Sequence, residues 1–165
     1  MKKTISFILF LFTIAISLGL NSCSESNCAL ETVPAAHFDF LSSDMHQPLA
    51  LTSEITVSAS TMIRDSIEYD TIYNAISNIN SLSLPLSYST KTTYIIHYTD
   101  LLMDKIEVTH RPIPFVSEIE CGVLMFHEIE DIQYTTNALD SIVILNKEIT
   151  NEERTNFHIY YTIAE

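Results

Sequence analysis

Short runs in which apolar residues alternate with polar ones constrain the fold of this 165-residue chain more than any other feature. Ile55, Val57 and Ala59, for example, alternate with Thr56 and Ser58, which is the period of a half-buried strand. β-Branched and aromatic residues dominate these runs, as is typical of strands. The strands expected on this basis cover 38–41, 54–60, 66–73, 81–86, 92–98, 104–110, 121–129, 139–145 and 156–163. Residues 74–79 are expected to form one helical turn.

Strands at this spacing, with no long amphipathic helix between them, predict an all-β fold. We expect one domain over residues 36–165, an antiparallel immunoglobulin-like β-sandwich of about 7–8 strands. The segments 92–98 and 104–110 are expected to form a hairpin. Pro85 predicts an edge strand, because proline cannot donate a ladder hydrogen bond.

Other segments are expected to depart from simple alternation. The contiguous apolar runs Val123–Phe126 and Ile142–Ile144 predict central strands that are buried on both faces. Arg111–Pro114 is expected to leave the sheet and cross to the other one, because two prolines each remove a donor. Gly122 is the one glycine after residue 22, and it marks a bulge, a close backbone approach or a plain strand start. Other left-handed backbone positions are then expected mostly at Asn and Asp.

The first 22 residues have the organisation of a lipoprotein signal peptide. Lys2 and Lys3 precede the apolar run Ile5–Leu20, and Leu20-Asn21-Ser22-Cys23 matches the pattern cut by lipoprotein signal peptidase. An ordinary secretory signal and a spanning anchor are the alternatives, but the apolar run of 16 residues is shorter than the roughly 20 needed to span a bilayer. We expect cleavage after residue 22, a lipid on Cys23, and a tether over 23–35. This places the protein in the cell envelope, with the outer membrane favoured.

Two cysteines remain once Cys23 carries the lipid. In an exported protein an even remainder favours a disulfide, here between Cys28 and Cys121. Two buried free thiols are the alternative. A zinc site is disfavoured because no paired histidines complete its ligand set.

The charge and the scarcity of glycine exclude several classes of function. Without Lys2 and Lys3 the chain has 6 basic and 21 acidic residues, a net charge of −15, which disfavours binding to nucleic acid. Phosphate loops, dinucleotide fingerprints and Gly-x-Ser-x-Gly elbows need glycines that the chain lacks. The sequence therefore predicts no enzyme and no cofactor, although a hydrolase built from distant residues stays a minor alternative.

Two groups of residues are candidate sites. His127-Glu128-Ile129-Glu130-Asp131 resembles a metal site, but a strand would place at most two of its ligands on one face, so we expect a solvated strand end. His97 is expected to be a half-buried strand residue. The eight tyrosines offer a stacking platform for a ligand if several are exposed together, but Tyr94 and Tyr98 share a face with Ile96, which favours the core.

Several motifs resemble an uncharacterised family of envelope lipoproteins from Bacteroidetes-type bacteria. The resemblance is carried by Ser81–Leu86, Asp104–Val108, Pro114–Ser117, Glu120-Cys121-Gly122 and Asn137–Ile142. It covers most of the chain after Cys28 and implies an envelope lipoprotein with no assigned catalytic residue.

Taken together, the sequence predicts a membrane-anchored, non-enzymatic binding or interaction module. Its expected partner is an envelope protein or polymer, recognised through strand edges and loops. The alternative is a surface glycan or small-ligand binder that uses exposed tyrosines, and a hydrolase is third.

Overall fold

The computed structural model describes residues 33–63, 66–116 and 122–162, and these residues form ten β-strands and no helix. The all-β prediction is therefore confirmed, with more strands than expected. The strands are β1 (Ala35–Ser42), β2 (Ile55–Ile63), β3 (Ser66–Ile76), β4 (Ser81–Pro85), β5 (Lys91–His97), β6 (Met103–Phe115), β7 (Leu124–Tyr134), β8 (Ser141–Ile144), β9 (Glu148–Ile149) and β10 (Thr155–Tyr161). The described residues contain no helix of the length and hydrophobicity that a membrane span requires.

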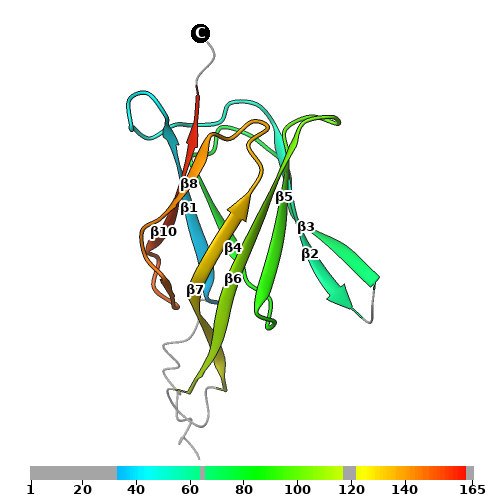
Figure 1. The fold of residues 1–165 in the computed structure, drawn as a ribbon, viewed down its shortest axis with the longest axis vertical. Coiled ribbons are helices and arrows are strands. Elements are labelled where there is room, and N and C mark those ends of the chain that lie inside the picture. Colours follow the sequence, from blue (N-terminus) through cyan, green and yellow to red (C-terminus); the bar gives the residue numbers. More distant parts are fainter. Residues whose placement is uncertain (1–32, 64–65, 117–121, 163–165) are drawn as a thin grey trace, which may run out of the picture.

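The strands form two sheets that face each other in a sandwich-like arrangement (Figure 1). The smaller sheet has the order β4-β1-β10-β8, and the larger has the order β3-β2-β5-β6-β7-β9. All pairs are antiparallel except β1 and β10, which run parallel. The expected 92–98/104–110 hairpin is confirmed as β5–β6. The predicted edge strand with Pro85 is confirmed as β4.

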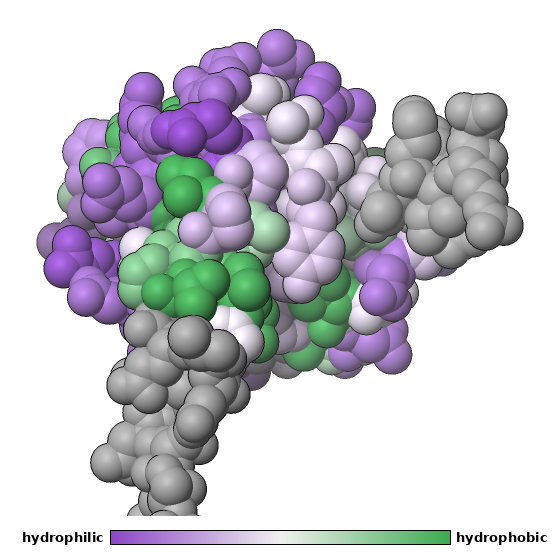
Figure 2. Space-filling view, turned by 90° about the horizontal axis from the view of Figure 1, so that it is seen from below, coloured by the Kyte–Doolittle hydropathy of each residue, from purple (hydrophilic) through white to green (hydrophobic). Residues whose placement is uncertain are grey.

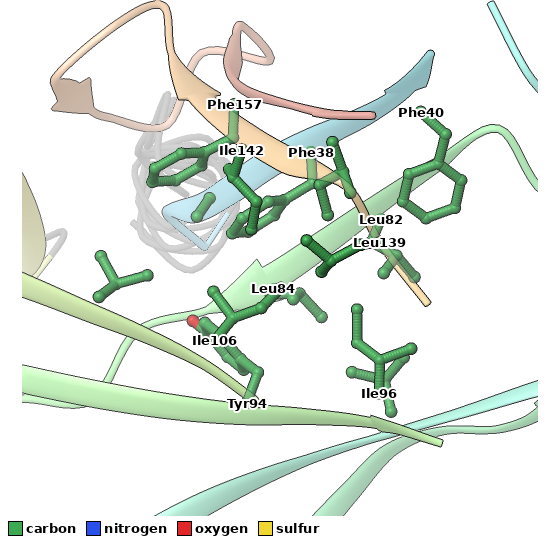
Figure 3. Packing of buried hydrophobic residues seen from close by; sticks show 14 of the residues in the cluster. Phe38, Phe40, Leu82, Leu84, Tyr94, Ile96, Ile106, Leu139, Ile142 and Phe157 are labelled. Atoms are coloured by element: carbon green, nitrogen blue, oxygen red, sulfur yellow. The ribbon is translucent and has the colours of Figure 1, made fainter. Parts of the chain in front are cut away.

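Side chains from both sheets meet in one hydrophobic core (Figure 3). Phe38 of β1 stacks on Phe157 of β10, with ring centroids 4.4 Å apart, and meets the edge of Tyr94 from β5 at 6.2 Å. The Tyr94 hydroxyl donates to the Pro85 carbonyl at 2.8 Å, which links the two sheets. The Tyr98 and Tyr161 hydroxyls form a second link at 3.0 Å. Burial in this core raises the pKa of Tyr94, Tyr98 and Tyr161.

Alternation identified the inward residues of most strands correctly. The buried members of these alternating sets are Ile55, Val57, Leu82, Leu84, Ile106, Val108, Phe157, Ile159 and Tyr161. His97 is half-buried, as expected. Alternation works here because each of these strands has one face on the core and one face toward solvent.

The prediction that Arg111–Pro114 crosses between sheets is wrong. β6 continues through both prolines to Phe115 and pairs with β7 throughout. The last hydrogen bond on the β5 side is donated by the His110 amide to the Thr90 carbonyl at 2.9 Å. Pro112 and Pro114 have the same parity as His110, so their nitrogens point toward the side where β5 has ended. Neither proline removes a donor that the sheet needs.

The apolar runs do not mark strands buried on both faces. Val123 is 62% exposed, and β7 begins only at Leu124. β8 is an edge strand of the smaller sheet, and its Val143 is 44% exposed. Residues 124–126 are only half-buried in β7, whereas in β8 Ile142 packs in the core and Val143 faces solvent.

The expected helical turn at 74–79 is also wrong, because β3 extends to Ile76. Left-handed backbone occurs within β3 at Ala75 (φ 49°) and after it at Asn78 (φ 56°), and His46 has the same conformation (φ 52°). Only one of these three residues is of the type expected. Gly122 also has a positive φ of 78°, and a Cβ there would meet no atom within 4 Å, so it supplies backbone freedom rather than a close approach.

Several predictions lie outside the described residues. They are the signal peptide over 1–22, the lipid on Cys23 and the Cys28–Cys121 disulfide.

Candidate functional site

A groove lined mostly by polar residue types lies on the outward face of the larger sheet. It has a volume of about 590 Å³ and is lined by Ser60, Tyr69, Ser87, Ser89, Thr90, Lys91, Thr93, Ile95, Lys105 and Glu107. The four lining strands are β2, β3, β5 and β6, and the connection between β4 and β5 closes one side. This groove is a candidate ligand site because side chains from separate strands converge on it.

The register of the sheet aligns part of the lining into one row. Tyr69 pairs with Ser60, Ser60 with Thr93, and Thr93 with Glu107. Adjacent strands lie about 4.8 Å apart, so this row crosses roughly 14 Å of the surface. Residues next to these in sequence, such as Tyr94 and Ile106, are fully buried on the opposite face. The fold therefore exposes an aromatic ring, two hydroxyls and a carboxylate in line.

Glu107 is the electrostatic centre of the groove. Its carboxylate contacts the Lys91 ammonium at 2.7 Å and the Lys105 ammonium at 3.1 Å. The hydrogen bonds from Lys91 and Lys105 lower the pKa of Glu107. Both lysine side chains are more than half exposed, so they can turn toward a ligand. The trio offers a ligand both hydrogen-bond donors and an acceptor.

Hydroxyl groups at the groove wall connect it to a buried histidine pair. Ser87 Oγ accepts from Thr92 Oγ1 at 3.0 Å, and Thr92 Oγ1 lies 2.8 Å from His110 Nε2. The Nδ1 atoms of His110 and His127 are 3.1 Å apart. Burial lowers the pKa of both histidines, to about 4 for His110, where the charge of His127 contributes as a second cause. The two rings are therefore neutral at pH 7, and one Nδ1 donates to the other.

The expectation that residues 127–131 form a solvated strand end is wrong for His127, which is 3% exposed. A register shift between Thr109 and His110 turns His127 and Ile129 inward and leaves Asp131 exposed. In the described part of the chain, neither ring of the histidine pair is hydrogen-bonded to a carboxylate. Within 33–63, 66–116 and 122–162, no three residues of the usual metal-ligand types are grouped so as to hold an ion.

The tyrosines do not gather into a platform. Tyr94 and Tyr161 are buried, and Tyr98 bonds to Tyr161, so the prediction that Tyr94 and Tyr98 belong to the core is confirmed. Tyr69 is 61% exposed and lines the groove. Tyr88 is 80% exposed but does not line the groove. The sequence did not single out the groove residues around Tyr69. Each of them is an ordinary outward-facing strand residue, and only the pairing of the strands brings them together.

The model of a family of unknown function (DUF6452) matches residues 54–161 of the chain. The match runs from the start of the larger sheet to the end of β10, and β1 lies before it. Neither the curated proteins nor the solved structures yield a match. Since the matched segment is well over half of the sequence, the chain belongs to the family of unknown function DUF6452.

Proposed function

We propose that this protein is a lipid-anchored binding module of the cell envelope, located at the outer membrane, and that it is not an enzyme. The anchor is supported by the charged start, the apolar run and the Leu20-Asn21-Ser22-Cys23 sequence. Nine residues lie between Cys23 and Val33, the first described residue, and this stretch spans at most about 35 Å when fully extended. The domain is thus held near its membrane.

The scaffold is proposed to be immunoglobulin-like. Two facing sheets with one shared core, a predominance of antiparallel pairs and short edge strands support this type. Such sandwiches present ligand surfaces on sheet faces and loops, and the architecture alone assigns no ligand.

The proposed ligand is a saccharide of the envelope or the cell surface, bound in the groove. The observation that carries this proposal is the row of Tyr69, Ser60, Thr93 and Glu107 across four strands. Sugar hydroxyls both donate and accept hydrogen bonds, which suits serine, threonine and the Lys-Glu-Lys trio. An exposed tyrosine ring such as Tyr69 can pack against the apolar face of a sugar.

Saccharide microarrays followed by calorimetry test the ligand. Tyr69→Ala and Glu107→Gln should each weaken binding by tenfold or more, the loss of about 1.4 kcal/mol. Glu152→Gln is the matched control, since Glu152 forms an exposed ion pair with Arg154 outside the groove. If no saccharide binds, or if both groove variants bind like the control, this ligand class is wrong.

A protein partner that adds a strand to β3 is the second candidate. β3 is an edge strand of 11 residues, the longest edge in either sheet of the described structure. Such an edge exposes backbone donors and acceptors to a partner. Crosslinking in intact cells, with a photoreactive residue at Thr71, should capture a protein neighbour if this candidate holds.

The anchor has its own test. Cys23→Ala should release the protein from the membrane fraction or block its processing. Retention of the variant with unchanged acylation would refute the lipid anchor.

We also propose a disulfide between Cys28 and Cys121, because an exported protein with two remaining cysteines favours a disulfide. The described residues nearest to the two cysteines support it, because β1 begins at the end of the molecule where β6 and β7 approach their connection (Figure 1). Val33 and Gly122 flank these cysteines at five residues and one residue, respectively.

A further inference from the structure

The basic side chains of this acidic chain are distributed unevenly. Six lysine and arginine residues follow residue 22, against 21 acidic residues. Two of the six, Lys91 and Lys105, line the groove, and Glu107 is the one acidic residue in the described part of its lining. Two ammonium groups and one carboxylate give this lining a local charge of +1, whereas the chain after residue 22 carries −15.

The ion pairs outside the groove are balanced one to one. The Arg111 guanidinium pairs with Glu128. The Arg154 guanidinium pairs with Glu152. Among the ion pairs of the described residues, Glu107 is the one carboxylate that two basic groups share. Hydrophilic side chains also cover much of the surface in Figure 2, so the sign of the charge, rather than polarity, distinguishes the groove.

The two ammonium groups screen the carboxylate that they share. The side chains of Lys91 and Lys105 are 55% and 54% exposed, whereas that of Glu107 is 18% exposed. Each ammonium contacts a different oxygen of Glu107, at 2.7 and 3.1 Å. The two hydrogen bonds lower the pKa of Glu107, so it stays ionised and keeps both lysines in place. A ligand in the groove therefore meets positive charge first.

The sheet sets the positions of the two lysines. On β6, Lys105 lies two residues before Glu107, and on the antiparallel neighbour β5, Lys91 lies opposite the residue two positions after Glu107. The two lysines therefore approach the carboxylate from opposite directions along the strands. The hydroxyls of Ser87 and Ser89 donate to the Lys91 carbonyl at 3.0 and 2.7 Å, which fixes the backbone from which that side chain extends.

Both ammonium groups keep hydrogen-bond donors for a ligand. A lysine ammonium has three donors, and within the described residues neither ammonium contacts an acceptor other than Glu107. Asp131 on the neighbouring strand β7 accepts a hydrogen bond from the Gln133 amide at 3.4 Å and contacts neither lysine. The second acceptor for the two ammonium groups is therefore left to a ligand.

We propose that the ligand of the groove is an acidic oligosaccharide, one of whose sugars places its carboxylate between the ammonium groups of Lys91 and Lys105. This inference rests on the proposed binding of a saccharide and narrows its chemical class. One carboxylate neutralises the local charge of +1, whereas a phosphomonoester carries about −1.5 to −2. Tyr69 lies three strand spacings from Glu107, roughly 14 Å, so its ring packs against a different sugar of the same ligand.

A matched pair of ligands isolates the charge. Oligosaccharides of glucuronic, galacturonic and mannuronic acid, and the methyl ester of each, are titrated by calorimetry into the full chain, purified in a non-ionic detergent. The ester keeps the rings and hydroxyls and removes the negative charge. At about 0.05 M salt, at least one acid should bind about tenfold more tightly than its ester, and this preference should shrink at about 0.5 M salt, where exposed charges are screened.

Lysine variants locate the carboxylate. Lys91→Gln and Lys105→Gln should each weaken binding of the acid about fivefold and binding of the ester less, and the double variant should bind the two forms equally. Lys147→Gln is the control, because it makes the same change of charge at an exposed residue outside the groove and should keep the preference. Circular dichroism verifies that each variant is folded.

Several outcomes would overturn the inference. One is an ester that binds as tightly as its acid, and another is a preference for the acid that survives in the double variant. Polyglutamate that competes as well as the acidic saccharides would mean that the groove recognises charge without the sugar. If a neutral saccharide binds and no acidic one does, the inference fails while the proposed function stands. If no saccharide of either kind binds, the proposed function fails as well.

Discussion

Asp104 is a fully buried carboxylate that holds the connection between β7 and β8. It accepts hydrogen bonds from the Thr135 hydroxyl and the Asn137 amide, both at 2.7 Å, and from the Ala138 and Leu139 amides, both at 2.9 Å. These contacts give the Asn-Ala-x-Asp-Ser segment a structural role. The carboxylate supplies the acceptors that this loop otherwise lacks.

Asp104→Asn should lower the free energy of unfolding by about 2–4 kcal/mol, because an amide replaces one acceptor oxygen with a donor that faces other donors. Urea unfolding measures the loss. Asp100→Asn, in the exposed β5–β6 turn, is the control and should change stability by less than about 0.5 kcal/mol. A similar loss in both variants would contradict the role of Asp104.

The buried histidines make stability depend on pH. The pKa of His110 is about 4 in the folded protein and about 6.5 in an unfolded chain, so only the unfolded state binds the proton between these values. Stability is therefore complete above about pH 6.5 and is lost as the pH falls toward 4. Between pH 7.5 and 5, His110 should account for a loss of about 2 kcal/mol. Urea unfolding of His110→Gln at both pH values should show this much less pH dependence, and an unchanged slope would contradict it.

At this scale the sequence predicts apolar positions well and buried polar positions poorly. Ile106 and Val108 are recognised by alternation alone, whereas Asp104 and His110, on the same face, look like solvent-facing residues. Their burial depends on partners far along the chain, since Asn137 follows Asp104 by 33 residues. His127 turns inward only because of the register shift opposite it.

Among the elements, the pairing of β1 with β10 carries much of the core. The two strands contribute Phe38, Phe40, Phe157 and Ile159, all at most 1% exposed. Alternation marks these residues as buried, but it cannot say that their strands are parallel neighbours. The strand order, which alternation does not encode, makes β1 and β10 neighbours. The same strand order explains why β6 continues through its prolines, since β5 no longer pairs with β6 there.

Phe157→Ala should cost about 3–5 kcal/mol, because it removes one ring of the stacked pair with Phe38 and leaves a cavity between the sheets. Thermal unfolding would show a large drop in Tm. Val143→Ala on the neighbouring β8 is the control, since Val143 is 44% exposed and should lose less than about 1 kcal/mol. Comparable losses in the two variants would contradict a core centred on this stack.

The whole molecule combines an acidic surface, one shared core and an entry point close to its proposed anchor. The sequence correctly indicated the all-β class, and its membrane address stays a prediction. It could not indicate the groove, because the groove arises only when strands align side by side. Tyr69 and Glu107 are 38 positions apart in sequence, yet they lie in one row of the sheet.

The proposed disulfide belongs to this scale, because it closes a loop of roughly 90 residues. The chain-entropy model assigns such a bridge on the order of 4–5 kcal/mol. Reduction of the exported protein, or Cys28→Ser, should therefore lower its stability by up to about this amount. Non-reducing peptide mapping should link Cys28 to Cys121, and recovery of both as free thiols would refute the bridge.

The parallel pairing of β1 with β10 also sets the time at which the domain can fold. His37 of β1 binds Asn156, 119 residues later, and β10 separates β1 from β8 in the smaller sheet. That sheet cannot assemble until β10 has been made, and contacts over such long separations form slowly. For an exported chain this delay is useful, since translocation requires an unfolded polypeptide. Under the proposed export, the strand order would keep the chain competent for passage until the last strand has crossed.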